Sequence, residues 1–419
     1  MASPSAVPSA AKLAEECSRE YDKGMPVLAL PPDAKTDLES LARFFLANNQ
    51  FGFLINQVVP WDYFNGEPNA GHRSIADLIT CGASFCAITT NFDVLIEKAA
   101  EGLGEKTFCA ALDGEEANVA RKYRPLLKIH GCFRQREYTL WCYDQLDVSR
   151  TDKVSTGLRD RIEKSRRWLQ GMLPRRQLVL IGFWSDWKYL NTVLVESIRD
   201  IYPAGILVID PSPSADLQTK APELWAWASS LGPTFHHVQE KAEVFLRELR
   251  ELFSRTILGR VLRDASDNNP GICNDFAVVT NSLKAQDADD LYELRRDFAG
   301  VPSETVARWK DPDPGKSGVG AAHLRMLSLG AKLDGSTYLA PPGKRVRIVN
   351  GCTLPMSKVR EKYSHELARN PPDDYIVCAA VDSSAGHPSI IPKATTSIVR
   401  PRSAAAWLTV EEAHNRGIL

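Results

Sequence analysis

The stretch "AITTNFDVLIEKAA", residues 87–100, decides the fold of the first part of this chain. Its opening residues, 87–90, are short, apolar and partly β-branched, which is typical of a buried strand. Asn91 and Asp93 follow, and an apolar run with helical spacing begins at Val94. Because ligands bind at the carboxyl ends of strands in open α/β sheets, an amide and a carboxylate at this junction indicate a site.

Three further segments have the same strand-like character, namely "LLKIH" (126–130), "LVLIG" (178–182) and "ILVID" (206–210). Amphipathic helical patterns occur at residues 190–202 and 240–253. Strands that alternate with helices predict an α/β fold, here a Rossmann-like, doubly wound parallel sheet.

With 419 residues the chain exceeds the usual size of one hydrophobic core, so we expect two domains. The first, residues 1–255, should end where its last strong helix stops near Arg255. The polar stretch 263–275 is typical of a linker or a long loop. Residues 256–419 contain a helical pattern at 287–298 and short segments punctuated by Pro and Gly, which predict a smaller α+β or β-rich C-terminal domain.

Composition excludes several classes of function. The chain has 51 Lys and Arg residues against 52 Asp and Glu residues, so no global field draws it onto nucleic acid or an anionic membrane. It has no apolar run of the roughly 18 residues that a membrane helix needs, and no signal-peptide pattern, so we expect a cytoplasmic protein. Nine cysteines, an odd number in a long chain expected in the cytosol, predict mostly reduced thiols. None of them forms a C-x-x-C motif, so no bound metal is expected.

Polar residues follow each of the four predicted strands. They are Thr90 to Asp93 after the first, His130 after the second, Gly182 after the third and Asp210 at the end of the fourth. In a doubly wound sheet these positions meet at one edge. Each also has an ordinary structural interpretation: Asn91 or Asp93 as a helix N-cap, and His130 as part of a turn.

The order of these motifs resembles the sirtuin-like family of NAD-consuming domains over about residues 9–250. The matching pieces are "PNAGH" (68–72), "IADLI" (75–79), "TTNFDVLIE" (89–97), "KIHG" (128–131), "LIGFWSDWKYLNTVL" (180–194) and "ILVIDPSP" (206–213). His72, in the first of these, has a simpler interpretation as a helix cap or an interhelix contact.

The resemblance implies a role for each catalytic candidate. Asn91 is similar to the asparagine that holds the nicotinamide ribose and the attacking water, and Asp93 to the carboxylate beside the carboxamide. His130 is similar to the general base. Cleavage of a glycosidic bond passes through an oxocarbenium-like state, which requires a positioned water and a base with a pKa near neutral.

The resemblance also implies a set of residues that bind NAD, which is the substrate. Thr90 accompanies Asn91, and Gly182 and Ser185 lie where the backbone approaches the cofactor. Asp210 accepts from the adenosine ribose hydroxyls. Asp186 belongs to the same set, although it is equally suited to cap a helix that starts near Trp187.

Two departures from the family refine these expectations. Sirtuin deacylases carry paired C-x-x-C zinc motifs, and their absence here favours the branch that hydrolyses NAD, members of which act in bacterial antiphage defence. The family also opens with an apolar strand and a Gly-rich loop, whereas residues 1–21 supply neither. We therefore expect the natural protein to begin upstream of Met1.

The sequence thus predicts an NAD glycohydrolase that releases nicotinamide and ADP-ribose and acts as a regulated antiphage effector. The alternatives are a degenerate sirtuin-like scaffold that binds a nucleotide or a partner without catalysis and, less favoured, a zinc-free deacylase. By analogy with the family, residues 256–419 are expected to mediate homo-oligomerisation or to dock a partner such as a translocase ATPase or a short Argonaute. Direct contact with nucleic acid or a membrane is not expected.

Overall fold

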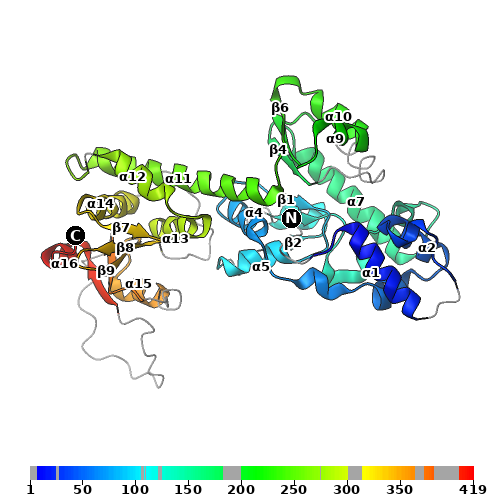
Figure 1. Cartoon of the computed structure of the whole chain (residues 1–419), viewed down its shortest axis with the longest axis horizontal. Coiled ribbons are helices and arrows are strands. Elements are labelled where there is room, and N and C mark those ends of the chain that lie inside the picture. The colour runs from blue at the N-terminus through cyan, green and yellow to red at the C-terminus, as the bar shows by residue number, and fades with distance from the viewer. Residues whose placement is uncertain are drawn as a thin grey trace, which may run out of the picture. The chain divides into compact units, whose positions relative to one another are not determined.

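The protein is described by a computed structural model that covers residues 7–24, 28–104, 108, 110–120, 125–182, 200–273, 275–300, 314–363, 372–381 and 405–419. The chain divides into two compact units, Met1–Arg247 and Glu248–Leu419 (Figure 1).

The first unit begins with helices. They are α1 (Ala10–Lys23), η1 (Asp33–Lys35), α2 (Leu38–Ala47), α3 (Phe51–Phe53), η2 (Leu54–Val58), η3 (Trp61–Asn65) and α4 (Ala70–Thr80). The side chains of Ser9, Asp37 and Asn69 accept from backbone N–H groups in the first turns of α1, α2 and α4 and so fix where these helices start. Apolar residues of α1, α2, η2 and η3 form one core, to which Phe45 and Trp61 contribute, whereas Ala76 of α4 packs in a separate core with residues of α5.

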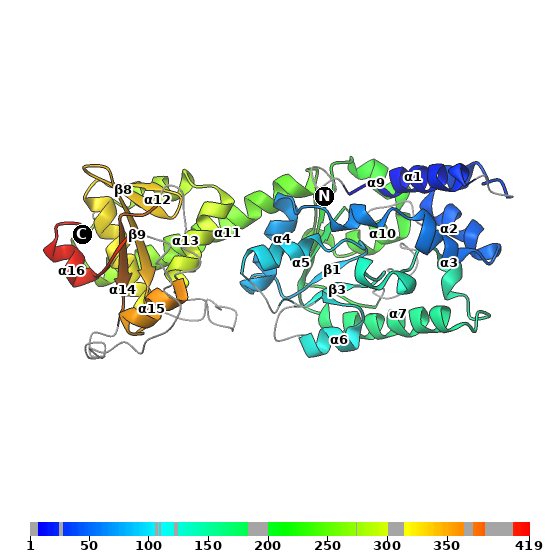
Figure 2. The same ribbon diagram turned by 90° about the horizontal axis from the view of Figure 1, so that it is seen from below.

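A first parallel sheet follows, in the order β1-β3-β2. Its strands are β1 (Ala87–Thr89), β2 (Ala110–Ala111) and β3 (Leu126–Lys128), and the accompanying helices are α5 (Leu95–Gly102), α6 (Gly114–Val119), η5 (Phe133–Tyr138), η6 (Tyr143–Leu146) and α7 (Lys153–Met172). In the pairing of β1 with β3, Thr89 lies opposite Lys128. Helices α6 and α7 lie side by side (Figure 2).

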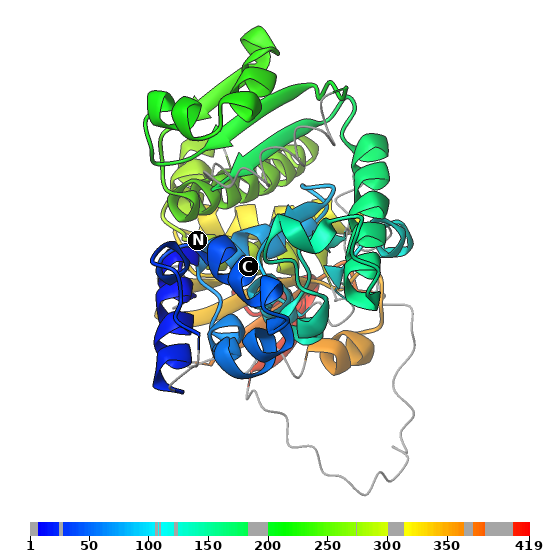
Figure 3. The same cartoon turned by 90° about the vertical axis from the view of Figure 1, so that its right-hand side faces the viewer.

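A second parallel sheet has the order β4-β5-β6. It contains β4 (Gln177–Ile181), β5 (Gly205–Ile209) and β6 (Phe235–Val238), with α9 (Ser214–Lys220), α10 (Pro222–Ser229) and η7 (Gly232–Thr234). Helices α9 and α10 lie over one face of this sheet (Figure 3) and bury Leu217 and Leu224 against it. The same core includes Leu127 of β3 and Leu180 of β4, so the two sheets share apolar packing.

All four strands predicted from the sequence are present and parallel, which confirms the α/β fold. They are divided between two small sheets, however, and do not form the single continuous sheet that was expected. β1 and β4 are each at the edge of their sheet, and the described residues ahead of β1 contain helices and no strand. The helix predicted at 190–202 lies almost wholly outside the described residues.

The second unit contains a mixed five-stranded sheet in the order β11-β10-β9-β8-β7, in which β7, β8 and β9 are antiparallel neighbours and β9, β10 and β11 are parallel. Its elements are α11 (Ala242–Asn268), which begins in the first unit, α12 (Phe276–Lys284), α13 (Ala288–Ala299), α14 (Pro314–Ser328), β7 (Lys332–Asp334), β8 (Thr337–Ala340), β9 (Lys344–Asn350), α15 (Met356–Tyr363), β10 (Tyr375–Ala379), β11 (Ala406–Thr409) and α16 (Val410–Asn415). The helix predicted at 287–298 is confirmed as α13.

Helix α11 is longer than the sequence pattern predicts. It does not stop near Arg255 but continues to Asn268, so much of the predicted linker 263–275 is helical. The reason is a buried stripe that persists through the polar sequence: Leu258, Leu262 and Ala265 are buried at helical spacing in the core of the second unit. The intervening polar residues therefore occupy the other faces of the helix.

Among the described residues, no helix is long and apolar enough to cross a membrane.

Candidate active site

The segment after β1 places an exposed amide beside a buried carboxylate. The N–H of Asn91 donates to Oγ1 of Thr89 at 3.1 Å, and the Asn91 side chain is exposed. Asp93 is only 5% exposed, and its Oδ1 accepts from the N–H of Leu95 at 3.1 Å, at the start of α5. The N-cap of α5 is Val94, without a side-chain cap, so Asp93 lies one residue before the cap position and has a second carboxylate oxygen to offer a ligand.

His130 follows β3 at the same edge of the same sheet. The N–H of Ile129 extends the β1–β3 ladder by donating to the carbonyl of Thr89 at 3.2 Å. Gly131 then turns the chain with φ = +102°, where an added Cβ would lie 2.7 Å from the carbonyl oxygen of Tyr138. The structure therefore brings the segments of Asn91, Asp93 and His130 together, as their positions after adjacent parallel strands predict.

His130 is 2% exposed, and this burial determines its protonation. Burial, with a smaller contribution from the positive charge of Arg161, lowers the pKa of His130 to about 3. The near-neutral pKa anticipated for a general base is therefore not found in the protein alone, and the imidazole is neutral at physiological pH.

His72 is a cap residue that also lies near the site. The N–H of His72 donates to Oδ1 of Asn69 at 3.1 Å, and the N–H of Asn69 donates to Nδ1 of His72 at 3.2 Å, which completes a capping box and confirms the cap interpretation. Burial lowers the pKa of His72, and the negative charge of Asp93 partly opposes this effect. The positions of His72 and Asp93 in the sequence do not by themselves predict this interaction.

A buried ion pair contacts the loop after β1, and it was not predicted from the sequence. Lys128 is 1% exposed, and its Nζ lies 2.8 Å from Oε1 of Glu97, which is 9% exposed. The same ammonium donates to the backbone carbonyl of Asp93. The signal that could have revealed it is a lysine within the apolar run "LLKIH".

Aromatic side chains hold the loop from its other side. The rings of Phe92 and Trp141 lie 4.9 Å apart between centroids, and Trp61 packs edge-on to Trp141 at 5.9 Å. The Arg136 guanidinium lies 5.2 Å from the Trp61 ring centroid. Phe92 is thereby anchored in the helical core, and its neighbours Asn91 and Asp93 are held on either side of this anchor.

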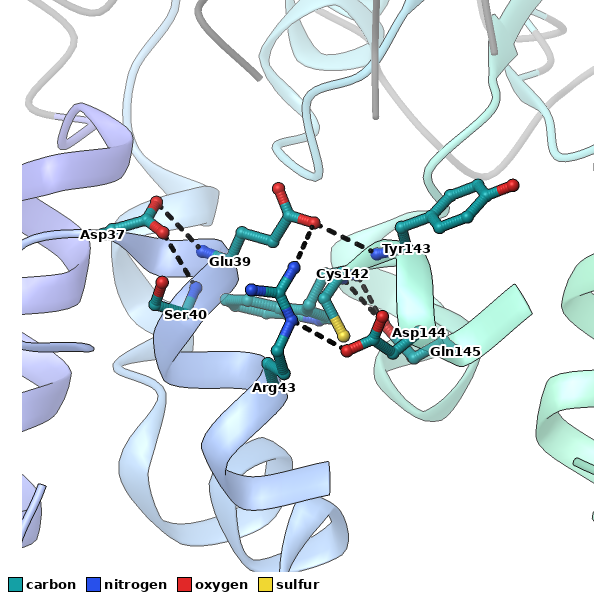
Figure 4. A network of polar contacts seen from close by, with 9 residues as sticks. Asp37, Glu39, Ser40, Arg43, Cys142, Tyr143, Asp144 and Gln145 are labelled. Atoms are coloured by element: carbon teal, nitrogen blue, oxygen red, sulfur yellow. Dashed lines mark hydrogen bonds and ion pairs between the residues drawn. The ribbon is translucent and has the colours of Figure 1, made fainter. Parts of the chain in front are cut away.

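The chain after His130 is tied to α2 by a polar network (Figure 4). Arg43 bridges two carboxylates, with Nε 2.8 Å from Oδ2 of Asp144 and Nη2 3.2 Å from Oε1 of Glu39. Gln145, which is 1% exposed, accepts through Oε1 from the N–H groups of Trp141 and Cys142 at 2.7 and 3.1 Å. These contacts fix the segment in which the N–H of Leu140 donates to the carbonyl of His130 at 2.8 Å.

Two of the predicted NAD-binding residues lie at the edge of the second sheet. Gly182 has φ = +56°, and its N–H donates to the carbonyl of Ile209 at 3.2 Å. Asp210 is 8% exposed, and its Oδ1 accepts from the N–H of Ser212 at 2.8 Å. Because Ile181 and Ile209 are register partners in parallel strands, Gly182 and Asp210 lie side by side.

His237 of β6 completes this edge: it shares hydrogen bonds with Oγ of Ser214 at 2.8 Å and with the carbonyl of Asp210 at 3.2 Å. Thr90 precedes Asn91 directly in the loop after β1. Ser185 and Asp186 lie outside the described residues. In the described part of the chain, no group of three or more His, Cys, Asp or Glu side chains is arranged to hold a metal ion.

Comparison with known families identifies the region that contains these edges. The match is to the family described as "SIR2-like domain", and it covers residues 86–230, from the residue before β1 to the residue after α10. Residues 86–230 form a SIR2-like domain. No curated protein matches the chain. The SIR2-like domain suggests an NAD-related activity and contains all eight candidate residues from Thr90 to Asp210.

Proposed function

We propose that the SIR2-like domain is an NAD glycohydrolase that cleaves NAD to nicotinamide and ADP-ribose. The observation that carries the proposal is the meeting of the Asn91–Asp93 loop and His130 at the carboxyl edge of β1 and β3. An exposed amide, a buried carboxylate and a neutral imidazole are the groups that water attack on a ribosyl carbon requires.

The proposed reaction needs no acid for its leaving group. When the bond between C1′ of ribose and the pyridinium nitrogen breaks, both electrons go to the ring, so nicotinamide leaves as a neutral molecule. Water then forms a bond to C1′ and loses one proton. Because the oxocarbenium-like carbon is strongly electrophilic, a weakly basic neutral imidazole such as that of His130 suffices to orient the water, and the proton passes on to solvent.

Each residue has one role in this proposal. The Asn91 amide holds the water and a ribose hydroxyl, His130 accepts a hydrogen bond from that water, and Oδ2 of Asp93 accepts from the carboxamide N–H. Gly182, Asp210 and, outside the described residues, Ser185 and Asp186 are proposed to bind the rest of NAD. Thr90 is proposed to contact the ribose beside Asn91.

The test is nicotinamide release from NAD, followed by chromatography, for the wild-type chain and His130→Ala. His236→Ala is the matched control, because His236 is an exposed histidine of the same unit. Release that disappears in His130→Ala but persists in His236→Ala supports the proposal. Equal release from all three proteins contradicts it, and thermal denaturation checks that each variant is folded.

The burial of His130 favours a second candidate, a SIR2-like scaffold that binds NAD without cleaving it. An imidazole that is 2% exposed is poorly placed to reach a substrate water unless the loop moves. Calorimetric titration with NAD separates the two: binding without release of nicotinamide supports the scaffold. A zinc-free deacylase is the third candidate, and release of an acyl group from an acyl-lysine peptide would support it.

The biological setting in the proposal comes from the family resemblance alone. We propose a regulated antiphage effector whose second unit mediates homo-oligomerisation or docks a partner such as a translocase ATPase or a short Argonaute. Two measurements test this: the mass of the purified chain by light scattering, and the survival of phage-challenged cells that express the wild type or His130→Ala.

A further inference from the structure

The ion pair beneath the candidate active site joins three elements that the proposed reaction needs to hold in register. Lys128 is the last residue of β3, two positions before His130. Its Nζ contacts Oε1 of Glu97, on α5, at 2.8 Å and donates to the backbone carbonyl of Asp93, in the loop after β1. A third neighbour is Sγ of Cys132 at 3.8 Å.

A lysine is costly at this position. The three residues of β3 are all buried, and an apolar side chain would suit the interior of a parallel sheet better than an ammonium group does. A buried charge persists only where it is paired and hydrogen-bonded. Here the pairing is directed, because one partner is a carboxylate of α5 and the other is a backbone carbonyl of the loop that carries Asn91.

We propose that Lys128 is a positioning residue, which holds the Asn91–Asp93 loop at a fixed distance from His130. Lys128 and His130 belong to the same backbone segment, at the end of β3, and the Lys128 ammonium is hydrogen-bonded to the loop. This one segment therefore sets the distance between the His130 imidazole and the Asn91 amide. Glu97 holds the ammonium in place from α5, four residues beyond Asp93. The expected effect of Lys128 on kcat rests on the proposed function, whereas its expected effect on the mobility of the loop does not.

The decisive variant removes the hydrogen bond from Lys128 to the loop without leaving an unpaired buried charge. In Lys128→Met with Glu97→Met, both charges are replaced by apolar side chains of similar length, a change that buried ion pairs often tolerate. Lys98→Met is the matched control: Lys98 is also on α5, and its Nζ also donates to backbone carbonyls, those of Asn65 at 2.7 Å and Gly66 at 3.0 Å. Its acceptors are the last residue of η3 and the residue after it, outside the Asn91–Asp93 loop.

Two readouts are measured on the full chain. Hydrogen exchange followed by mass spectrometry should show faster exchange at residues 90–95 in the double variant, with wild-type exchange there in Lys98→Met. The kcat for nicotinamide release should fall roughly 100-fold in the double variant, as expected when reacting groups are displaced by about 1 Å, while the KM for NAD changes by less than about 3-fold.

Wild-type exchange at residues 90–95 in a folded double variant would overturn the proposal, and so would an unchanged kcat. If the wild-type chain releases no nicotinamide, the proposed function fails and the exchange measurement alone decides whether Lys128 holds the loop. If the double variant does not fold, Glu97→Gln replaces it. This change leaves the ammonium in place but weakens its hold, and exchange at residues 90–95 should still increase relative to Lys98→Met.

Discussion

The backbone N–H of Phe133 donates to the carbonyl oxygen of Phe92 at 2.8 Å. The N–H of Ile129 donates to the carbonyl of Thr89 at 3.2 Å, so backbone hydrogen bonds to the end of β1 and to the loop after it lie on both sides of His130. The two segments with candidate catalytic residues are therefore hydrogen-bonded to each other through their backbones. Side-chain substitutions at Asn91 or His130 leave these bonds intact, which makes their catalytic effects interpretable.

Asn91→Ala is expected to abolish most nicotinamide release without destabilising the protein. The side chain is exposed, and the hydrogen bond between this residue and Thr89 is made by the backbone N–H. We expect kcat/KM to fall by roughly 100-fold or more and the free energy of unfolding to change by less than about 0.5 kcal/mol. Steady-state kinetics and urea denaturation measure the two effects. A large loss of stability would instead assign Asn91 a structural role.

The pH dependence of kcat/KM should show no acid limb from His130 between about pH 5 and pH 8. Burial lowers the pKa of this imidazole to about 3, so the neutral form that accepts a hydrogen bond is fully populated over that range. The measurement is kcat/KM for NAD in a series of buffers of constant ionic strength. An acid limb centred near 6.5, together with a midpoint near 6.5 for the His130 ring in an NMR titration of the wild type, would show that His130 titrates like an exposed histidine.

The second unit should lose stability in mild acid because of His323. Burial lowers the pKa of His323 to about 3, and its ring stacks on Phe298 at 4.3 Å between centroids. Below pH 6.5 the unfolded chain binds a proton that the folded chain does not, so this stability is present above pH 6.5 and declines as the pH falls toward 3. At pH 5 the loss from this one residue is about 2 kcal/mol.

Hydrogen exchange in β8 and β9 at pH 7.5 and pH 5, corrected for intrinsic rates, measures this effect. His323 Nδ1 shares a hydrogen bond with the Tyr338 hydroxyl at 2.9 Å, so the comparison protein carries His323→Phe together with Tyr338→Phe. Replacing both partners avoids a buried unsatisfied hydroxyl. The double variant should show a weaker pH dependence in these strands; an unchanged dependence would exclude His323 as its source.

Arg347→Met should destabilise the second unit by about 3–5 kcal/mol. The guanidinium is fully buried and grips Asp297 with two hydrogen bonds of 2.8 and 2.7 Å, so its removal leaves a buried carboxylate unpaired. Adding Asp297→Leu removes that carboxylate, and the double variant should be more stable than Arg347→Met alone. Urea denaturation of the four proteins gives the coupling free energy. Additive effects would show that the pair does not act as a unit.

The local pattern of the sequence predicted the strands well but not how they pair. Each of the four predicted strands is a short apolar run bounded by polar residues or glycine, and such runs need no knowledge of their partners. Strand β2, with only the residues Ala110 and Ala111, is too short for any pattern. The division into two sheets depends on pairing between distant segments, such as Ile88 with Leu127, which no local window contains.

The candidate site shows the same limit. That His130 and Asn91 belong to one edge followed from their positions after adjacent parallel strands. The near-complete burial of His130 did not, because it depends on the helices and aromatic rings packed around the loop. Lys128 was missed for a related reason: a lone lysine in an apolar strand gains meaning only when its acceptors, Glu97 and the Asp93 carbonyl, are known.

Helix α11 has a consequence for anyone who wishes to produce the two halves of the protein separately. It runs without interruption from Ala242 to Asn268, and the boundary between the units, after Arg247, falls inside it. A fragment that ends at Arg255 would retain Arg250, which is 1% exposed, but lose its partner Asp289. No position within α11 separates the two units without dividing the helix, so fragments of the first and of the second unit should both include residues 242–268.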